Sequence, residues 1–374
     1  MAKIKVLQVQ GGMNKGGVES IIMSWYRNID TDKIQFDFTT CFEHKCPYDD
    51  EILERGGNIY YIPPRSKVGN IKHIYYLYKC IKEHGPYDVV HSHMNFHGGV
   101  VSIAAKLAGC KNIVMHAHNT KDDGTGLKRK IEVFILKNTM KFLSDKFLAC
   151  GEEAGFFIYG KHNFEVISNS VDRRMFKAKD KKKDKDLIKL INRYNLGEKI
   201  ILGNIGRFSS QKNHRYMLDI MRELKARNFN FKFVFIGDGE LKCWFEKEII
   251  RFGLEENVLM LGLVDNVNEW LNIMDVLIMP SLYEGLPVVV IEAQSCGTQC
   301  ILSKNITKEA DLGIGLIKYL DIDKTSLIQW INEIERININ NKILDNDIIE
   351  LNLVKKGFNL KANIEKMEKI YLRK

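Results

Sequence analysis

The chain has 374 residues, of which 45% are hydrophobic and 28% are charged, as in an ordinary globular protein. This length predicts two domains rather than one. The formal net charge of +9 suits partners that carry negative charge: nucleic acid, an anionic membrane or an anionic substrate. No nucleic-acid-binding motif accompanies that charge, so we expect attraction to phosphates and lipid head groups rather than to nucleic acid.

No apolar run reaches the ~18–20 residues of a membrane-spanning helix, and the first residues lack the apolar core of a secretory signal. The eight cysteines are scattered and several lie in apolar runs, which indicates reduced, buried thiols. These features predict a cytoplasmic protein.

The first half of the chain alternates strand and helix patterns, as expected for a parallel sheet covered on both faces. Helical patterns occupy 18–29 and 71–84. The expected strands are 3–10, 36–42, 58–62, 88–93, 112–118, 146–150 and 165–168.

A second alternation follows a run of charged residues at 177–186. This run is expected to be a solvated linker or loop near the domain boundary, and a membrane or nucleic-acid role for it is the alternative. Helices are expected at 213–227, at 241–252 and after 322. The expected strands are 200–205, 231–236, 258–261, 276–279, 300–302 and 316–320.

The stretch 281–297 predicts a loop and a helix directly after a buried strand. Pro287 suits the first helical position and Gly297 suits the helix stop. The free amides and dipole of such a helix N-terminus attract phosphate. Glu284 in the loop and Glu292 in the helix could then hold hydroxyl groups on either side of a diphosphate.

Arg207 and Lys212 follow the first strand of the second half. A guanidinium and an ammonium five residues apart at a strand end can converge on one diphosphate. Two such cations would stabilise negative charge that grows on that diphosphate during a reaction. Because no convincing Asp-x-Asp motif ends a strand, we expect neither a metal nor another cofactor.

Glu284 and Glu292, in the setting Pro-Ser-x-x-Glu-Gly-Leu-Pro, resemble the donor-site signature of retaining GT-B glycosyltransferases that use nucleotide sugars. The chain is most similar to the family 4 branch (glycosyl transferases group 1) that builds bacterial capsular polysaccharides and exopolysaccharides. Arg207 and Lys212 match that family's Gly-Arg-x4-Lys motif.

The resemblance implies an α/β fold of two facing Rossmann-like domains with parallel sheets and a cleft between them. Residues 1–176 would form the acceptor-side domain and 187–355 the nucleotide-sugar-binding domain. The last helix, about 356–374, would pack back on the N-terminal domain.

The resemblance also assigns roles to individual residues. The catalytic group would be Arg207, Lys212, Glu284 and His118. The donor-binding group would be Gly16, Gly17, Gly237, Val264, Gly285, Leu286, Pro287, Val288 and Glu292.

Two histidine pairs, His91 with His93 and His116 with His118, end neighbouring strands, where open α/β sheets bind ligands. His118 matches the family's cleft histidine, whose implied role is to contact the transferred sugar near C6 and not to act as a general base. The acceptor side would include His93, His116 and Asn169.

The family usually has glycine where Ser170 stands, so a left-handed backbone at that position is in doubt. The stretch 127–147 places basic residues around an apolar face. It is either a domain helix with a solvated basic side or a helix that touches anionic membrane.

Together with these residues, the resemblance implies a metal-independent, retaining glycosyltransferase. It would move a sugar from a nucleotide-diphosphate sugar, with a UDP-sugar favoured, to a lipid-linked or glycan acceptor in surface polysaccharide biosynthesis. It would work in the cytoplasm, with peripheral association at the inner face of the membrane. The alternatives are a nucleotide-sugar 2-epimerase of the same fold and a non-catalytic sugar- or lipid-binding protein.

Overall fold

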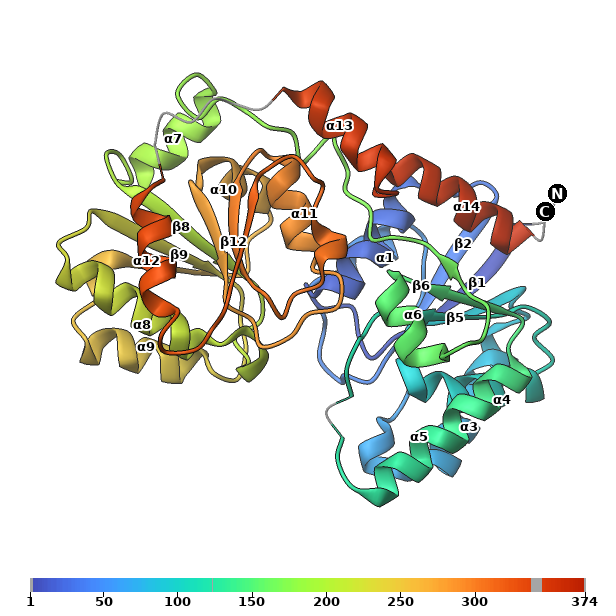
Figure 1. Cartoon of the computed structure of the whole chain (residues 1–374). Coiled ribbons are helices and arrows are strands. Elements are labelled where there is room, and N and C mark those ends of the chain that lie inside the picture. The colour runs from blue at the N-terminus through green and yellow to red at the C-terminus, as the bar shows by residue number, and fades with distance from the viewer. Residues whose placement is uncertain (1–2, 123, 338–344, 373–374) are drawn as a thin grey trace. The chain divides into compact units, whose positions relative to one another are not determined.

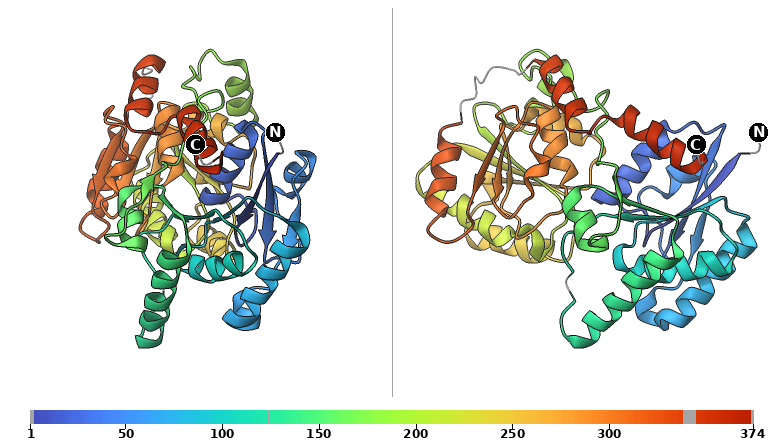
Figure 2. Two further views of the ribbon diagram at one scale, coloured as in Figure 1. Left: turned by 90° about the vertical axis from the view of Figure 1, so that its right-hand side faces the viewer. Right: turned by 45° about the vertical axis from the view of Figure 1, so that its right-hand side comes forward.

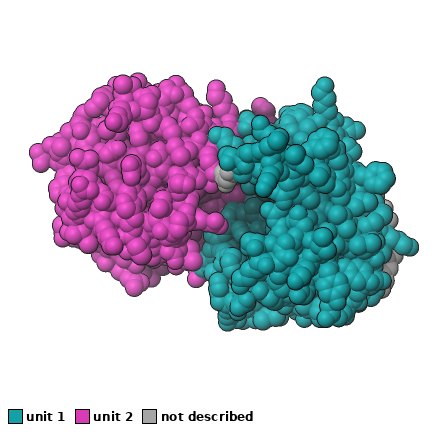
Figure 3. Space-filling model, turned by 90° about the horizontal axis from the view of Figure 1, so that it is seen from below, with its two compact units in different colours: residues 1–170, 359–374 teal, residues 171–358 magenta. Residues whose placement is uncertain are grey.

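The computed structural model describes residues 3–122, 124–337 and 345–372 (Figure 1). The chain divides into two compact units, coloured separately in Figure 3. Unit 1 comprises residues 1–170 and 359–374, and unit 2 comprises residues 171–358.

Unit 1 is built on a parallel sheet of seven strands in the order β3-β2-β1-β4-β5-β6-β7. The strand order reverses between β1 and β4, and ligands of open α/β sheets bind at such a switch point. The strands are β1 Ile4–Val9, β2 Ile34–Thr40, β3 Ile59–Tyr61, β4 Val89–Ser92, β5 Ile113–Ala117, β6 Lys146–Ala149 and β7 Glu165–Val166.

The helices of unit 1 cover this sheet, and α3, α4 and α5 lie side by side in Figures 1 and 2. The last helix, α14, packs against α1 and β1, so residues from both ends of the chain build this unit. The helices are α1 Gly17–Asn28, α2 Asp49–Glu54, α3 Arg65–His84, η1 Asn95–His97, α4 Gly98–Leu107, α5 Leu127–Leu143, α6 Glu152–Tyr159 and α14 Leu360–Leu372.

Unit 2 repeats the plan with six parallel strands in the order β10-β9-β8-β11-β12-β13. Its central strands are mostly apolar, as expected when helices cover both faces, and Phe231, Phe233 and Phe235 of β9 are all buried. The strands are β8 Ile200–Ile205, β9 Phe231–Ile236, β10 Val258–Gly262, β11 Val276–Met279, β12 Gln299–Ser303 and β13 Ile317–Leu320.

The helices of unit 2 follow these strands in turn, and α13 ends just before the chain returns to unit 1. They are α7 Lys185–Arg193, η2 Ser210–Lys212, α8 His214–Ala226, α9 Lys242–Arg251, η3 Glu255–Asn257, α10 Val267–Ile273, α11 Val288–Ser295, η4 Lys308–Ala310, α12 Leu327–Glu335 and α13 Asn346–Lys355. Among the described residues, no helix has both the length and the apolar character needed to cross a bilayer.

The charged run at 177–186 is a loop that leads into α7 just after the start of unit 2, and half of its side chains are exposed. The Lys181 ammonium lies 2.5 Å from the Asp275 carboxylate, whose side chain is only 7% exposed. The Asp184 carboxylate caps α7 by accepting from the backbone N–H groups of Asp186 and Leu187. Lys181 and Asp184 therefore tie the run to unit 2, while the remaining charges of the run lie at the surface or only partly buried.

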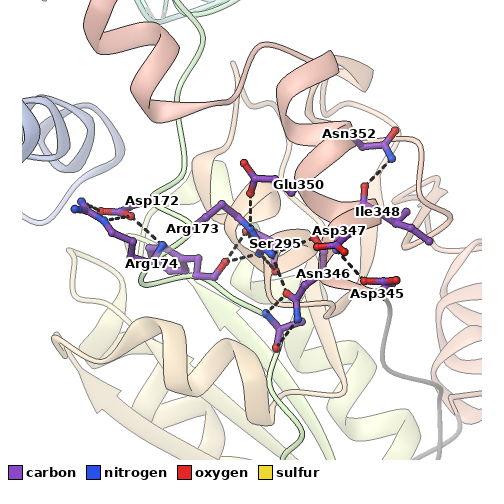
Figure 4. A network of polar contacts seen from close by, with 12 residues as sticks. Asp172, Arg173, Arg174, Ser295, Asp345, Asn346, Asp347, Ile348, Glu350 and Asn352 are labelled. Carbon is purple, nitrogen blue, oxygen red and sulfur yellow. Dashed lines mark hydrogen bonds and ion pairs between the residues drawn. The ribbon is translucent and has the colours of Figure 1, made fainter.

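A polar network around Arg173 holds the start of unit 2 together (Figure 4). Its guanidinium donates to the Ser295 carbonyl at 2.7 Å and to the Asn346 Oδ1 atom at 2.8 Å, and it pairs with the Glu350 carboxylate at 3.1 Å. These bonds tie the segment after residue 170 to the end of α11 and to α13. The sequence gives no local sign of them.

Candidate functional site

In unit 2, the loops after two neighbouring strands bring Lys212 and Glu284 together. The Lys212 ammonium lies 2.7 Å from the Glu284 carboxylate, and the two side chains are 13% and 10% exposed. Gln211 joins the same loops, since its backbone carbonyl accepts from the Leu282 N–H at 2.8 Å. Its side-chain amide also donates to the Glu284 carboxylate at 3.2 Å. The structure therefore presents a shielded charge pair at the carboxyl ends of β8 and β11.

Arg207 stands apart from this pair. Its side chain is exposed, and across the described parts of the chain the guanidinium has no ion-pair partner. Arg207 therefore keeps its hydrogen-bond donors available to a ligand, whereas Lys212 is already engaged.

Glycines let the strand ends of unit 2 approach each other closely. A Cβ atom on Gly237 would come within 2.0 Å of the Gly206 carbonyl oxygen, which is backbone and cannot give way. A Cβ atom on Gly206 would meet the Lys212 side chain at 2.8 Å. The absence of a side chain at Gly237 therefore allows the ends of β8 and β9 to approach each other, and its absence at Gly206 leaves space for the aliphatic part of the Lys212 side chain.

Helix α11 begins one residue later than the sequence predicts. Pro287 is the N-cap with an extended ψ of 107°, so the helix starts at Val288, and the prediction of Pro287 as the first helical residue is wrong. Gly297 follows the C-cap Cys296 with a φ of +79°, as its predicted role as helix stop requires. Leu286 and Pro287 are buried, while Gly285 and Val288 are partly exposed beside them.

Glu292 lies in the second turn of α11. Part of the residue reaches solvent, yet its carboxyl group lies deep enough that burial raises its pKa to about 7. Val264, in the loop after β10, is partly exposed. Two residues before Val264, the Gly262 carbonyl accepts from the Gly237 N–H at 2.8 Å, which holds the end of β10 beside the end of β9.

In unit 1, the four histidines predicted at strand ends are all buried at the ends of β4 and β5. Within this cluster His93 and His118 are joined by a 2.9 Å contact between Nδ1 and Nε2. The indole ring of Trp25 stacks on His91 and His116 with centroid distances of 6.2 and 5.5 Å. The cluster consists of His91, His93, His116 and His118.

The histidine cluster is linked to the last helix by a chain of hydrogen bonds. The Gln8 amide nitrogen donates to the Tyr371 hydroxyl at 3.2 Å, and its Oε1 atom lies 2.9 Å from His93 Nε2. The Tyr371 hydroxyl lies 2.8 Å from His91 Nδ1. In this arrangement His93 Nε2 carries the proton, so His93 Nδ1 accepts from His118 Nε2–H. His118 Nδ1 is then a bare acceptor.

Burial makes the cluster neutral. Desolvation lowers the pKa of His118 to about 3 and holds the pKa values of His91, His93 and His116 well below their usual range. Neighbouring imidazoles lower the last three further, because a second positive charge nearby is unfavourable. Neutral rings can orient a substrate, but they cannot store a proton at neutral pH.

The cluster does not have the spacing of a metal centre as it stands. Ligating atoms of His91, His93 and His116 lie within 4.8 Å of one another. A tetrahedral zinc ion holds its nitrogen ligands only about 3.4 Å apart. The rings are also stacked, and both His93 nitrogens already have hydrogen-bond partners. A metal would have to pull the rings together and displace these bonds.

The remaining predicted residues of unit 1 lie at separate points. Gly16 is the N-cap of α1, where a Cβ atom would come within 2.3 Å of the Glu19 carboxylate; Gly17 is exposed. Asn169 is buried. Ser170 has no positive φ, and its hydroxyl accepts from the Asn363 amide of α14 at 2.9 Å. The departure from the family's glycine is therefore accommodated.

Two family models match the chain. The model for glycosyl transferases group 1 matches residues 184–312, and the model for Glycosyltransferase Family 4 matches residues 15–174. EpsF of Bacillus subtilis (strain 168), provisionally assigned as a glycosyltransferase, is 34% identical over 373 residues, which cover 98% of this chain and 96% of EpsF. The chain belongs to glycosyltransferase family 4.

Two further relatives are named for a lipid-linked acceptor or for polysaccharide biosynthesis. The Escherichia coli UDP-Gal:alpha-D-GlcNAc-diphosphoundecaprenol alpha-1,3-galactosyltransferase is 27% identical over 99% of this chain and 97% of its own length. The Staphylococcus aureus capsular polysaccharide biosynthesis glycosyltransferase CapH is 28% identical over 83% of each chain. This family 4 protein is accordingly a glycosyltransferase of polysaccharide biosynthesis.

Solved structures show the same fold. Anabaena Alr3699/HepE in complex with UDP-glucose matches 98% of both chains with a TM-score of 0.77 and 16% identity. WaaG, a glycosyltransferase involved in lipopolysaccharide biosynthesis, matches 98% of this chain and 99% of its own with a TM-score of 0.71 and 15% identity. Each unit is thus a Rossmann-like domain of a GT-B glycosyltransferase, as the sequence predicts.

Proposed function

We propose that this glycosyltransferase transfers a sugar from a UDP-sugar to a lipid-linked acceptor, with retention of the anomeric configuration. The observation that carries the proposal is the shielded Lys212–Glu284 pair at the strand ends of unit 2, with exposed Arg207 on the same loop as Lys212. The Escherichia coli relative is named for UDP-Gal and a diphosphoundecaprenol-linked acceptor, and the Anabaena protein was solved with UDP-glucose. Both support this choice of substrates.

The donor diphosphate would replace the Glu284 carboxylate as the partner of the Lys212 ammonium. In the structure the Lys212 ammonium is paired with this carboxylate at 2.7 Å. A diphosphate between Lys212 and Arg207 would draw the ammonium away, because it carries more charge than one carboxylate. Glu284 would then accept hydrogen bonds from sugar hydroxyl groups, and the first amides of α11 would face a phosphate.

Bond cleavage needs no protein nucleophile in this scheme. As the bond from the anomeric carbon to the phosphate oxygen breaks, negative charge grows on the diphosphate, where Arg207 and Lys212 stabilise it. The acceptor hydroxyl attacks from the same face and gives its proton to the departing phosphate oxygen. Glu292 would hold the ribose hydroxyls, and the contact of His118 with the transferred sugar stays what the family resemblance implies.

Helix α5 supports a peripheral membrane role. Five exposed apolar residues recur at helical spacing on its solvent side, while Leu136 and Met140 face the protein. Basic residues flank the apolar stripe: Lys128, Lys130, Lys137 and Lys141. The stripe consists of Leu127, Ile131, Phe134, Ile135 and Phe142. We propose that this face rests on anionic lipid. Equal sedimentation of the protein with anionic and neutral vesicles at low salt would contradict it.

A donor-hydrolysis screen tests the catalytic proposal. The full chain is incubated with several UDP- and GDP-sugars, and released UDP or GDP, free sugar and its anomeric form are measured by NMR. We expect slow hydrolysis of one UDP-sugar with the α configuration retained. Release of a C2 epimer would favour the 2-epimerase alternative, and tight nucleotide-sugar binding without turnover would favour a binding protein.

A further inference from the structure

Gln211 is a second partner of the Glu284 carboxylate, beside Lys212. The two carboxylate oxygens of Glu284 face different neighbours. Oε1 lies 2.7 Å from the Lys212 ammonium, and Oε2 accepts from the Gln211 side-chain amide at 3.2 Å. An ammonium is a cation, whereas an amide is neutral. An anionic diphosphate therefore attracts Lys212 away from Glu284 but does not attract Gln211 in the same way.

The orientation of the Gln211 amide follows from its partners. Its nitrogen donates to the Tyr283 carbonyl at 3.0 Å as well as to Glu284, so both of its hydrogens have acceptors. A carbonyl and an ionised carboxylate can only accept, so the amide oxygen could not take the place of the nitrogen. The amide nitrogen is therefore fixed on residues 283 and 284, and its bond to Glu284 is separate from the ion pair with Lys212.

Contacts that do not involve the Gln211 amide join the same two loops. The backbone carbonyl of Gln211 accepts from the Leu282 N–H at 2.8 Å. Asn213, with a left-handed φ of 56°, donates from its side chain to the Pro280 carbonyl at 3.1 Å. A substitution that changes only the end of the Gln211 side chain therefore tests the amide itself rather than the joining of the loops.

Glu284 is also fixed to a third loop and is shielded from water. Its backbone forms an isolated parallel bridge with Ile306, in the loop after β12. Its side chain is only 10% exposed, so few water molecules can reach the carboxylate to replace a lost partner. A donor at Oε2 therefore matters most when Lys212 has moved away from Oε1.

We propose that Gln211 is a positioning residue that keeps the Glu284 carboxylate in place when the donor diphosphate draws Lys212 away. The inference rests on the proposed function, which supplies the diphosphate and the transferred sugar, and it adds the group that orients Glu284 while the donor is bound. Oε2 of Glu284 stays bonded to the Gln211 amide, and Oε1 becomes free for a hydroxyl group of the transferred sugar. Gln211 thus decides which oxygen of Glu284 meets the sugar.

The first test needs no nucleotide and measures hydrogen exchange at the Leu282 amide, which bonds to the Gln211 carbonyl. Lys212→Met removes the ammonium from Oε1, so the Gln211 amide then provides a larger share of the stabilisation of the Glu284 carboxylate. We expect Gln211→Met to speed exchange by about 3-fold in the parent chain and by about 10-fold or more in the Lys212→Met background. An equal effect in both backgrounds would overturn the inference.

The second test compares turnover with nucleotide binding. Gln211→Met keeps the length of the side chain but removes the amide donor, and it should lower kcat/KM for UDP-sugar hydrolysis by about 10-fold. The substrate is UDP-galactose or UDP-glucose, whichever the unaltered chain hydrolyses faster. Affinity for UDP, measured by calorimetry, should change by less than about 3-fold, because UDP lacks the transferred sugar that Glu284 holds. Equal losses in both measurements would leave Gln211 a merely structural role and contradict the inference.

A carboxyl group in place of the amide adds a pH-dependent readout. Gln211→Glu sets a second carboxylate against Glu284, and two neighbouring carboxylates favour sharing one proton. As the pH falls from about 8 to about 6, the pair takes up that proton, and the hydrogen bond at Oε2 can form again. The hydrolysis rate of Gln211→Glu relative to that of the unaltered chain should therefore rise by about 3-fold or more over this range. A constant ratio would show that no such bond is needed.

Gln329, an exposed glutamine on α12 of unit 2, provides the matched control. Gln329→Met and Gln329→Glu make the same chemical changes and should leave exchange at Leu282, turnover and UDP affinity unchanged. Thermal unfolding of each Gln211 variant shows whether a lost rate reflects lost folding.

The outcomes for the proposed function and for Gln211 stay separate. Normal turnover by Gln211→Met would sink only the positioning role, because the unaltered site would still transfer the sugar. Failure of the unaltered chain to hydrolyse either UDP-sugar would sink the proposed function, and the exchange test, which needs no donor, then decides the role of Gln211 by itself.

Discussion

The two units place different chemistry at equivalent ends of their parallel sheets. In unit 1 the ends of β4 and β5 carry buried, neutral imidazoles that are connected to one another and to Tyr371 by hydrogen bonds. In unit 2 the ends of β8 and β11 carry a charged pair, Lys212 with Glu284. One sheet therefore offers oriented, uncharged hydrogen bonds, and the other offers full charges that a charged ligand can take over.

The largest expected difference between the two units is the loss of stability at acid pH. Burial lowers the pKa values of the four histidines in the folded protein, whereas in the unfolded chain a histidine takes up a proton below a pKa of about 6.5. The free energy of unfolding is therefore highest above pH 6.5, and it decreases as the pH falls below that value. At pH 5.5 each buried histidine should cost on the order of 1 kcal/mol, and the cluster several times that amount. Hydrogen exchange should show β4 and β5 opening before β8 and β11. Equal loss of protection in both sheets would contradict the contrast.

Removing a charge from unit 2 should mainly affect turnover. Lys212→Ala or Arg207→Ala should lower the rate of UDP-sugar turnover by about 100-fold or more, as expected when one charge-stabilising group is lost from a transition state. Lys189→Ala, at an exposed position of α7, serves as the matched control and should keep the full rate. Near-normal rates in both site variants would defeat the proposed mechanism.

A smaller effect should follow from breaking the hydrogen-bond chain of unit 1 at its far end. Tyr371→Phe removes the hydroxyl that orients Gln8 and contacts His91, and should cost about 1 kcal/mol of stability. Tyr371 is a positioning residue, so the decisive readout is the nitrogen NMR spectrum of His118. We expect a bare Nδ1 in the parent protein and a mixture of tautomers in the variant. An unchanged spectrum would show that the chain does not set the tautomer.

The smallest effect concerns Glu292. Its pKa of about 7 predicts that UDP affinity rises by a few-fold as pH rises through 7, because the ionised carboxylate accepts both ribose hydroxyl bonds. Glu292→Gln should remove this pH step while other pH effects remain. Calorimetric titration with UDP at several pH values measures it, and a step that persists in the variant would assign it to another group.

The sequence predicted most of the strands and the loops that carry the charged pair, because these depend on local patterns. The alternation of apolar runs with helical periodicity marks β8 to β12, and the motifs around Arg207, Lys212 and Glu284 are contiguous. The start of a helix depends on the backbone angles of a single residue, which the local pattern does not determine. The extended ψ of Pro287 places the start of α11 one residue later than predicted.

Long-range polar contacts could not be predicted in the same way. The bond between His91 and Tyr371 joins residues 280 positions apart, and Lys181 meets Asp275 across 94 positions. Neither pair has a local signature, since the sheet order decides which side chains meet. The left-handed Asn213 is a partial exception, because asparagine tolerates a positive φ better than most residues.

The return of α14 to unit 1 has a consequence for the order of folding. Gln8 and His91 are synthesised early, yet their partner Tyr371 leaves the ribosome only after all of unit 2 has been made. Until Tyr371 is made, Gln8 and His91 in the interior of the first domain therefore lack one of their hydrogen-bond partners. A nascent chain cut short before α14 should carry a finished second domain beside an unfinished first one, which proteases can recognise.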